Sequence, residues 1–436
     1  MLRHTSRIVA LALAVGLVAA APHGGRRPVL VPSVSVFLAA ASAVASRALL
    51  PLASLAIPVA VVVLLRPRWF CRWLCPMGLC MDAASHLGRL AGRHRRRFPP
   101  AGQWFVWITL AGAVLGYPLF VWLDPLALLT GILHLEVSRR SPPAMWYAAA
   151  GVLFLVSGVL WPGSWCSYLC PLGAFQDILT RLRKALAGCP ATFRERSQSG
   201  PAAGSPSRRA VLGGTAGVVF ALFMRRAPLS HARPLRPPGA VDESRLAALC
   251  ARCGNCVAVC PTGVIAPNLA PSGLSQLLTP VLRFDRDYCL EDCVACTASC
   301  PTGALSPLLP KDKAAVKIGL AQVNMDLCLL AEDRECSECR NRCPYEVIRY
   351  VFSEELYVLT PVIDPLRCNG CGACQAACPV RPLRAITVAR LGPEKTAENG
   401  VIGLDFFVRR RSTVVGARTA RDPARLRRIV ADNAAY

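Results

Sequence analysis

The sequence contains few charged residues and few histidines for its length. Of its 436 residues, 17% are charged and 53% are hydrophobic, and only six are histidines. The charged fraction is below the roughly 25% that is usual for soluble domains. Acidic residues are scarcest, with 26 Asp and Glu against 50 Lys and Arg, which gives a formal net charge of +24. This composition favours membrane segments over an ordinary soluble enzyme.

Several cofactor motifs are also missing. The sequence has no C-x-x-C-H haem-attachment motif, no phosphate-binding glycine-rich loop, no dinucleotide-binding fingerprint and no flavin-attachment motif. The clearest apolar runs contain no histidine, so a pair of membrane b-haems is not expected there. No pattern indicates a catalytic acid, base or nucleophile. We therefore expect neither haem nor flavin, and an electron conduit rather than a complete enzyme.

Basic residues flank the apolar runs. Residues 48–65, 104–123 and 145–161 are nearly free of charge, and each approaches the ~20 residues that span a bilayer. The loops after the first and third runs are strongly basic, which the positive-inside rule places in the cytoplasm. We interpret the basic excess as a topology signal, with no nucleic-acid partner. Two further apolar stretches lie near the N-terminus: residues 8–21 form either a span or a signal sequence, and residues 28–46 form either a span or a re-entrant or outer-surface segment. The prediction is an all-α membrane bundle of about four to six spans.

Cysteine is abundant, with 22 residues, and sixteen of these form four quartets. Every quartet ends in C-x-x-C-x-x-x-C-P, and the quartets begin at positions 250, 289, 328 and 368, spacings of 39, 39 and 40 residues. In this ferredoxin pattern three thiolates bind three irons of one cubane, and the fourth thiolate binds the neighbouring cluster. The quartets are Cys250, Cys253, Cys256 and Cys260; Cys289, Cys293, Cys296 and Cys300; Cys328, Cys336, Cys339 and Cys343; Cys368, Cys371, Cys374 and Cys378.

Zinc and disulfides are the alternatives to iron–sulfur clusters. Zinc fingers use paired ligands, and no histidine lies between Cys250 and Cys378. Disulfides would not require four copies of one spacing. We therefore predict four 4Fe–4S clusters in an α+β polyferredoxin domain built from two bacterial-ferredoxin-like modules.

A second repeat lies beside the apolar runs. The pattern C-x-x-x-C-P-x-G-x-x-x-D occurs at Cys71 and Cys75 and again, 95 residues later, at Cys166 and Cys170. Two predicted spans separate the copies, so both would lie on the same side of a membrane. These four thiols could hold a fifth cluster, pass electrons as thiols, or only shape the ends of helices.

The predicted domain boundaries follow these motifs. Residues 1–187 form the transmembrane domain, 188–242 a linker, 243–405 the four-cluster domain and 406–436 a basic tail. The linker contains a twin-arginine-like sequence, Ser207-Arg208-Arg209, ahead of a short apolar run at 210–224. The tail could bind an acidic partner or lipid headgroups, or simply be solvated.

These motifs resemble the NapH and NapG ferredoxin-type proteins of periplasmic nitrate reductase systems, and the similar MauN and MauM proteins. The two C-x-x-x-C-P motifs carry the NapH-like resemblance over residues 1–187, and the four quartets carry the NapG-like resemblance over residues 207–390. The sequence therefore resembles a fusion of the two.

The resemblance implies a multi-pass protein of the bacterial inner membrane that takes electrons from quinol. The C-x-x-x-C-P motifs would face the cytoplasm, and the ferredoxin domain would pass electrons to periplasmic or membrane redox partners such as cytochromes or a reductase. A role as an accessory or maturation factor for a periplasmic oxidoreductase is the alternative.

The resemblance further implies that quartet one pairs with four, and two with three. One cluster would then be held by Cys250, Cys253, Cys256 and Cys378, its neighbour by Cys368, Cys371, Cys374 and Cys260, a third by Cys289, Cys293, Cys296 and Cys343, and the last by Cys328, Cys336, Cys339 and Cys300.

Overall fold

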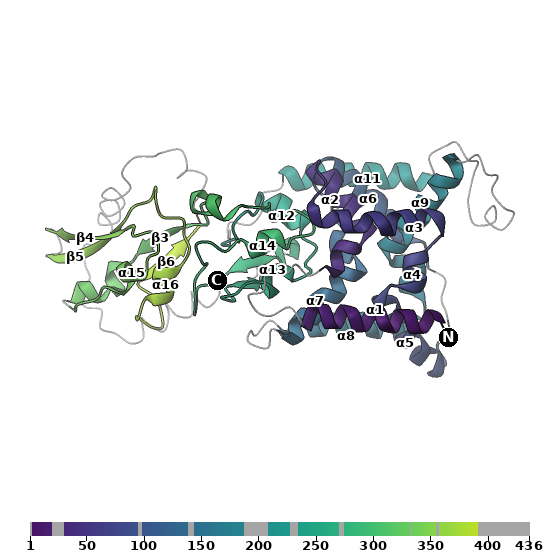
Figure 1. Cartoon of the computed structure of the whole chain (residues 1–436), viewed down its shortest axis with the longest axis horizontal. Coiled ribbons are helices and arrows are strands. Elements are labelled where there is room, and N and C mark those ends of the chain that lie inside the picture. Colours follow the sequence, from purple (N-terminus) through teal and green to yellow (C-terminus); the bar gives the residue numbers. More distant parts are fainter. Residues whose placement is uncertain are drawn as a thin grey trace.

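The chain folds into a helical body and a ferredoxin part that lie end to end (Figure 1). The computed structural model describes residues 2–19, 30–94, 98–137, 144–186, 208–226, 234–269, 274–332, 334–354 and 357–390. All sixteen quartet cysteines and the four C-x-x-x-C-P cysteines fall within these ranges. The predicted basic tail and about half of the predicted linker lie outside them.

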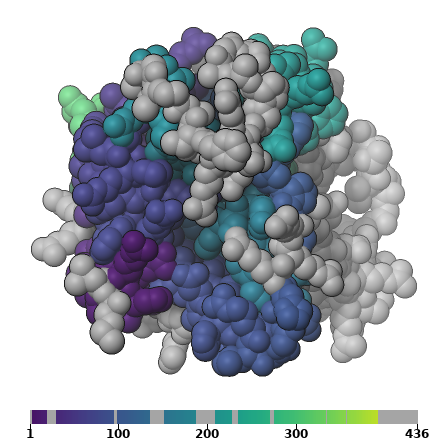
Figure 2. Space-filling view, turned by 90° about the vertical axis from the view of Figure 1, so that its right-hand side faces the viewer, coloured from purple at the N-terminus to yellow at the C-terminus, as the bar shows by residue number. Residues whose placement is uncertain are grey.

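The helical body is formed by the N-terminal half of the chain. Seen from its end, purple, blue and teal segments share one face, so helices far apart in sequence lie side by side (Figure 2). Its α-helices are α1 Leu2–Ala19, α2 Val36–Ser46, α3 Ala56–Leu65, α4 Trp69–Trp73, α5 Pro76–Leu90, α6 Ala101–Val114, α7 Pro125–Val137, α8 Ala144–Leu160, α9 Pro171–Leu186 and α11 Arg208–Arg226. Short 3₁₀ turns occur at Val31–Val34, Pro51–Leu55 and Val121–Leu123, and Trp165–Leu169 is π-helical.

Two of the three clearest predicted membrane spans are interrupted, which corrects the sequence-based expectation, whereas the third forms the continuous 17-residue helix α8. A 3₁₀ turn that starts at Pro51 precedes α3 within the first run. In the second run α6 ends at Val114, because Gly116 adopts a φ of 88° and Pro118 follows. The 14 residues of α6 rise about 21 Å, short of the ~30 Å hydrocarbon core. Among the described residues, no helix combines the length and the apolar character needed to cross a bilayer, so the predicted membrane bundle is not supported.

Close backbone contacts hold α11 against α6. Gly213, Gly217 and Ala221, spaced four residues apart, are the buried residues of α11. A Cβ at Gly217 would lie 2.5 Å from the carbonyl oxygen of Ile108, so only glycine permits this approach. The short apolar helix that follows Arg208 and Arg209 therefore packs on the helical body.

The ferredoxin part consists of two modules. In the first, β1 (Ile265–Pro267) pairs with β2 (Pro280–Leu282) between quartets one and two. In the second, β4 (Ile348–Ser353) pairs with β5 (Val358–Ile363) between quartets three and four, and β3 (Leu320–Val323) pairs with β6 (Ile386–Ala389). All three pairings are antiparallel. The short helices are α12 Glu243–Leu249, α13 Asn255–Ala258, α14 Ala295–Ala298, α15 Glu338–Asn341 and α16 Ala373–Ala377, with 3₁₀ turns at Leu274–Gln276, Pro310–Ala315, Met325–Leu327 and Leu329–Glu332.

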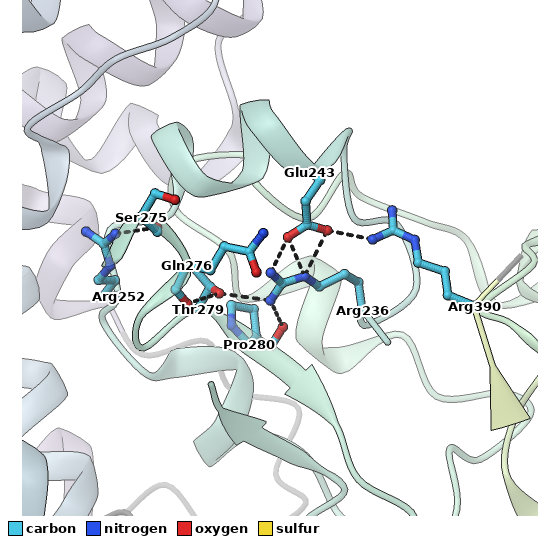
Figure 3. A network of polar contacts seen from close by, with 8 residues as sticks. All are labelled: Arg236, Glu243, Arg252, Ser275, Gln276, Thr279, Pro280 and Arg390. Atoms are coloured by element: carbon cyan, nitrogen blue, oxygen red, sulfur yellow. Dashed lines mark hydrogen bonds and ion pairs between the residues drawn. The ribbon is translucent and has the colours of Figure 1, made fainter. Parts of the chain in front are cut away.

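A buried ion network links the two modules (Figure 3). The Arg236 side chain is 4% exposed and donates to both Glu243 oxygens, to Thr279 and to the Pro280 carbonyl oxygen. Arg390, which directly follows β6, donates to Glu243 across 2.5 Å. Burial alone would raise the pKa of Glu243, but the bonds and charges of the two arginines lower it overall. Glu243 therefore joins the start of the first module to the end of the second.

We predict that Glu243→Gln destabilises the ferredoxin part by about 3 kcal/mol, because it leaves the charge of buried Arg236 uncompensated. The measurement is the urea midpoint at which cluster absorbance is lost, with exposed Glu354→Gln as the control. The folded-state pKa of Glu243 lies below its unfolded value of about 4.3. Ionised Glu243 therefore contributes fully to the free energy of unfolding above that pH. This contribution is lost as the pH falls through the folded-state pKa. Equal midpoints for the two variants near pH 7 would contradict this account.

Candidate iron–sulfur sites

Each quartet wraps a turn that leads into a short helix. The third cysteine lies in α13, α14, α15 or α16, within a turn of the first helical residue. In quartets one and four the residue before the helix is glycine with a left-handed backbone, Gly254 at φ 75° and Gly372 at φ 82°. In quartets two and three, which have longer first gaps, Val294 and Ser337 occupy this place at φ −120° and −125°. The left-handed glycine therefore occurs only in the two quartets with the shorter first gap.

The second module contains two hollows, each lined by four cysteines. We call the first hollow site C, lined by Cys328, Cys336, Cys339 and Cys378, and the second site D, lined by Cys343, Cys368, Cys371 and Cys374.

The cysteines of the first module gather in the same way. Burial raises the pKa of Cys256, and the charges of Cys250, Cys253 and Cys300 raise it further. Burial likewise raises the pKa of Cys296, with additional repulsion from three neighbouring thiolates. We define site A as Cys250, Cys253, Cys256 and Cys300, and site B as Cys260, Cys289, Cys293 and Cys296.

The pairing of quartets implied by the family resemblance is wrong. Quartet one shares its sites with quartet two, and quartet three with quartet four. In every quartet the fourth cysteine lies with the first three of its neighbour, as ferredoxin chemistry requires. Sequence spacing leaves the partner open, because all four quartets end in the same pattern. The intervening β-hairpins bring consecutive quartets together.

The four sites follow one another along the ferredoxin part. Site A lies beside the helical body, where the Asn255 side chain is 3.3 Å from His134 and the Arg252 guanidinium lies 5.3 Å from the centre of the Trp122 ring. Sites B and D are joined by a hydrogen bond from the Cys289 amide to the Cys371 carbonyl, at 2.9 Å. Site C shares the second module with site D. The order along the molecule is therefore A, B, D, C.

The C-x-x-x-C-P cysteines form one further group inside the helical body. Burial raises the pKa of Cys170 well above its usual value, and repulsion from Cys71, Cys166 and Cys75 raises it further. Thus two segments 95 residues apart in sequence meet at one place, which we call the helical site: Cys71, Cys75, Cys166 and Cys170.

The two halves of the helical site are built alike. The Gly78 amide donates to the Cys75 sulfur at 3.3 Å, and the Gly173 amide donates to the Cys170 sulfur at 3.5 Å. In both halves the motif proline begins a helix, α5 or α9. The Gln176 amide adds a hydrogen bond to the Cys71 sulfur at 3.3 Å.

The motif aspartates are paired with arginines. Asp177 pairs with Arg68 and Asp82 pairs with Arg7, each at 2.5 Å. The aspartates were identifiable from the sequence because they belong to the repeated pattern. Both arginines lie outside that pattern, and Gln176 occupies one of its variable positions, so the repeat gave no signal for them.

Burial keeps the thiols of the helical site in their neutral form. Burial raises the pKa of Cys71 to about 12 and that of Cys166 to about 11. These groups are therefore neutral thiols at neutral pH unless iron or another metal cation binds to them. Within the described residues, no three His, Cys, Asp or Glu side chains converge to hold a single metal ion. Cubane ligands each bind a different iron, so they need not converge on one point.

Comparison with known proteins places iron–sulfur domains on these segments. A 4Fe-4S dicluster domain matches residues 249–304, which contain quartets one and two, and residues 334–381, which contain quartet four and all of quartet three except Cys328. A 4Fe-4S binding domain matches residues 48–97 and 142–190, which contain the two C-x-x-x-C-P motifs. The dicluster matches and the cysteine spacing indicate four 4Fe–4S clusters.

Three relatives illustrate the similarity. Ferredoxin-type protein NapF of Haemophilus influenzae is 34% identical, over 34% of this chain and 77% of its own length. Ferredoxin-type protein NapG of Escherichia coli is 34% identical, over 37% of this chain and 73% of its own length. The methylamine utilization ferredoxin-type protein MauM of Methylophilus methylotrophus is 36% identical, over 35% of this chain and 69% of its own length. No solved structure matches significantly.

The pairing can be tested by counting iron in a pair of variants. Cys336→Ala and Cys378→Ala both affect site C, so each single variant should lose about four irons and the double variant no more than that. The measurement is iron per chain after anaerobic purification. Cys336→Ala combined with Cys260→Ala affects two sites and should lose about eight irons. If the Cys336/Cys378 double variant also lost about eight, these two cysteines would belong to different clusters and the pairing of quartets three and four would be wrong.

Proposed function

The chain belongs to the family of ferredoxin-type proteins that includes NapF, NapG and MauM, and on this basis we propose that it conducts electrons from a membrane quinol to a redox protein partner. The observation that carries the proposal is the order of the sites: A lies beside the helical body, followed by B, D and C. Such an order suits stepwise transfer along the molecule. The clusters supply the redox chemistry, and the chain sets their spacing and surroundings.

Electrons would enter through the helical site, and the helix α6 connects that site to site A. A Cβ at Gly102, near the start of α6, would lie 2.9 Å from the Cys170 carbonyl oxygen. Near the other end, Ala113 belongs to an apolar cluster that also contains Leu249 and Cys250. Gly102 and Ala113 are 11 residues apart, or about 16 Å along the helix axis.

Aromatic rings lie along the same route. The centres of Phe105 and Phe120 are 5.0 Å apart, those of Phe120 and Trp122 are 6.5 Å apart, and Arg252 covers Trp122. Arg252 directly precedes the site A ligand Cys253. These contacts support electron transfer between the helical site and site A.

The helical site is proposed to hold a fifth 4Fe–4S cluster. Four sulfurs from two halves meet there, three of them accept hydrogen bonds that favour thiolates, and a 4Fe-4S binding domain matches both halves. In this arrangement Cys71, Cys75, Cys166 and Cys170 are the ligands. Arg68 lies near enough to Cys71 to oppose the rise of its pKa.

Electrons would leave at site C. Its cavity is lined by Pro361 of β5, and the Tyr350 hydroxyl of β4 lies 3.7 Å from the Cys339 sulfur. Beyond these contacts the hairpin bears exposed apolar side chains, including Phe352 at 55% and Tyr357 at 79%. A cytochrome or a reductase subunit is the kind of partner that would accept electrons there.

We also propose that the exposed apolar faces of the helical body contact lipid. Leu65, Leu153, Val219 and Phe223 are each more than 60% exposed, although an aqueous surface would favour polar residues there. The small-residue face of α11 is typical of helices that pack within membranes. The protein would then be a NapH-like protein of the bacterial inner membrane.

The orientation follows from the basic residues. The helical site and the ferredoxin part contact opposite ends of α6. Basic residues such as Arg89 and Arg183 lie in the helices that continue from the two C-x-x-x-C-P motifs, which supports a cytoplasmic helical site. The ferredoxin part would then be periplasmic.

The double variant Cys71→Ala/Cys166→Ala tests the fifth cluster. It should contain about four irons fewer than the unmodified protein while keeping the paramagnetic signals of the four ferredoxin clusters. Cys80→Ala, a half-buried thiol outside the helical site, is the control and should retain all iron. An iron content unchanged by the double variant would contradict a cluster at the helical site.

The same double variant tests the direction of electron flow. In membranes containing the unmodified protein, an added quinol should reduce the ferredoxin clusters, as followed by low-temperature paramagnetic resonance. In the double variant the quinol should fail while dithionite still reduces them. Equal reduction by quinol in both proteins would show that electrons bypass the helical site.

Membrane association can be measured by extraction. The protein in bacterial membranes should resist washing with alkaline carbonate and dissolve only with detergent. Val219→Glu combined with Phe223→Glu adds charge to the apolar face of α11 and should weaken retention, whereas exposed Glu354→Gln should not. Release of the unmodified protein by salt or carbonate alone would contradict insertion into lipid.

A further inference from the structure

Lys313 is a fully buried lysine in the ferredoxin part. It lies in the 3₁₀ turn Pro310–Ala315, and its side chain is among the largest of those that are wholly inaccessible. Its ammonium group donates to the carbonyl oxygens of Leu290 and Cys293, the latter at 2.6 Å. Both carbonyls belong to the loop that forms site B.

This cation has no carboxylate partner in the described part of the chain, where the ion pairs all involve arginine. An ammonium removed from water requires a compensating negative charge, because hydrogen bonds to neutral carbonyls do not replace its hydration. Two site B cysteines, Cys289 and Cys296, lie within electrostatic reach of this ammonium group. Burial raises the pKa of Cys289, and the charge and hydrogen bond of Lys313 oppose this rise. The charge of Lys313 also opposes the raised pKa of Cys296.

A 4Fe–4S cluster with four thiolates carries a net negative charge, and that charge grows by one when the cluster accepts an electron. A fixed cation beside it stabilises the reduced form more than the oxidised form. Local charge is one of the terms that set cluster potentials. The effect is greatest where water cannot screen the charge, as at a fully buried site.

We propose that Lys313 raises the reduction potential of the cluster at site B, so that this cluster holds the electron most strongly among the four. This inference deepens the proposed function, since it rests on site B binding a 4Fe–4S cluster. Lys313 does not bind the cluster itself; it holds a fixed positive charge beside the cluster. The step it favours is the arrival of one electron at site B, with no proton transferred and no bond formed.

Cations near the other sites are either paired or less deeply buried. At site A the charges of Arg252 and Arg236 act on Cys250, but Arg236 is paired with Glu243 and Arg252 is only half-buried. At site C the half-buried Arg384 interacts with Cys378. At site A the Thr302 hydroxyl lies 3.6 Å from the Cys300 sulfur, and at site C the Tyr350 hydroxyl lies 3.7 Å from the Cys339 sulfur, but both groups are neutral. Near site D, Lys317 donates to the Cys368 carbonyl at 2.7 Å, but this lysine is exposed. Water screens its charge, which makes Lys317 a matched control.

The experiment is a redox titration of the purified, full-length protein, followed by low-temperature paramagnetic resonance. Lys313→Gln removes the charge but keeps a hydrogen-bond donor. We expect one of the four cluster potentials to move to a more negative value, so that the order of reduction changes. Lys317→Met should leave all four potentials in place. Four unchanged potentials in Lys313→Gln would overturn the proposal.

Lys313→Arg covers the case in which the neutral variant fails to assemble the site. Arginine keeps the positive charge, so this variant should retain the cluster and a potential near that of the unmodified protein. Loss of about four irons in Lys313→Gln but not in Lys313→Arg would show that the cluster at site B needs a positive charge at this position, which supports the proposal. If Lys313→Arg behaved as Lys313→Gln does, the proposal would be overturned.

The titration uses chemical mediators and dithionite, not quinol or a partner protein. Failure of the proposed conduction from quinol would therefore leave the potential of site B measurable. Conversely, four unchanged potentials would refute the role of Lys313 without affecting quinol oxidation.

Discussion

The shared fourth cysteine is the constraint on which the ferredoxin part depends. Each quartet supplies three sulfurs to one site and one sulfur to the neighbouring site, so neither site is complete until both quartets have folded together. Cys260 and Cys300 join the first two quartets in this way, and Cys343 and Cys378 join the last two. The hairpins β1–β2 and β4–β5 lie between the quartets that must meet. Cluster binding and module folding are therefore coupled.

The two modules are held in line by contacts that do not involve iron. Glu243 bridges Arg236 and Arg390, and the Cys289 amide donates to Cys371. At the other end, α7 presents His134 to Asn255, which lies between two site A cysteines. These contacts place the first module between the helical body and the second module. The order of the sites is thus a property of the fold as well as of the sequence.

Part of this arrangement could be predicted from the sequence. The quartets identify their own chemistry, because three close thiolates, a displaced fourth and a proline are specific to cubane ferredoxins. The 95-residue repeat predicts that Cys71 and Cys166 lie on the same side of a membrane, which stays a prediction, but the structure does bring the two cysteines to one site. Identical quartet endings could not reveal which quartets pair. That choice depends on hairpin length and on packing between modules.

Other features lay beyond sequence reasoning for physical reasons. Hydropathy detects apolar runs but not the backbone breaks at Pro51 and Gly116 that shorten the helices. Lys313 stands near Lys311 and Lys317, which are exposed, so its burial could not be distinguished from a solvated basic stretch. The domain boundaries, the role of the tail at 406–436 and the cellular location stay predictions.

The central claim is that the quartets hold cubane clusters in two coupled pairs. The most direct test is to measure iron and acid-labile sulfide in the anaerobically purified protein, together with the paramagnetic spectrum of the reduced state. The account predicts at least about sixteen of each per chain, with signals broadened by interaction between neighbouring clusters. Zinc in place of iron, without labile sulfide, would contradict it.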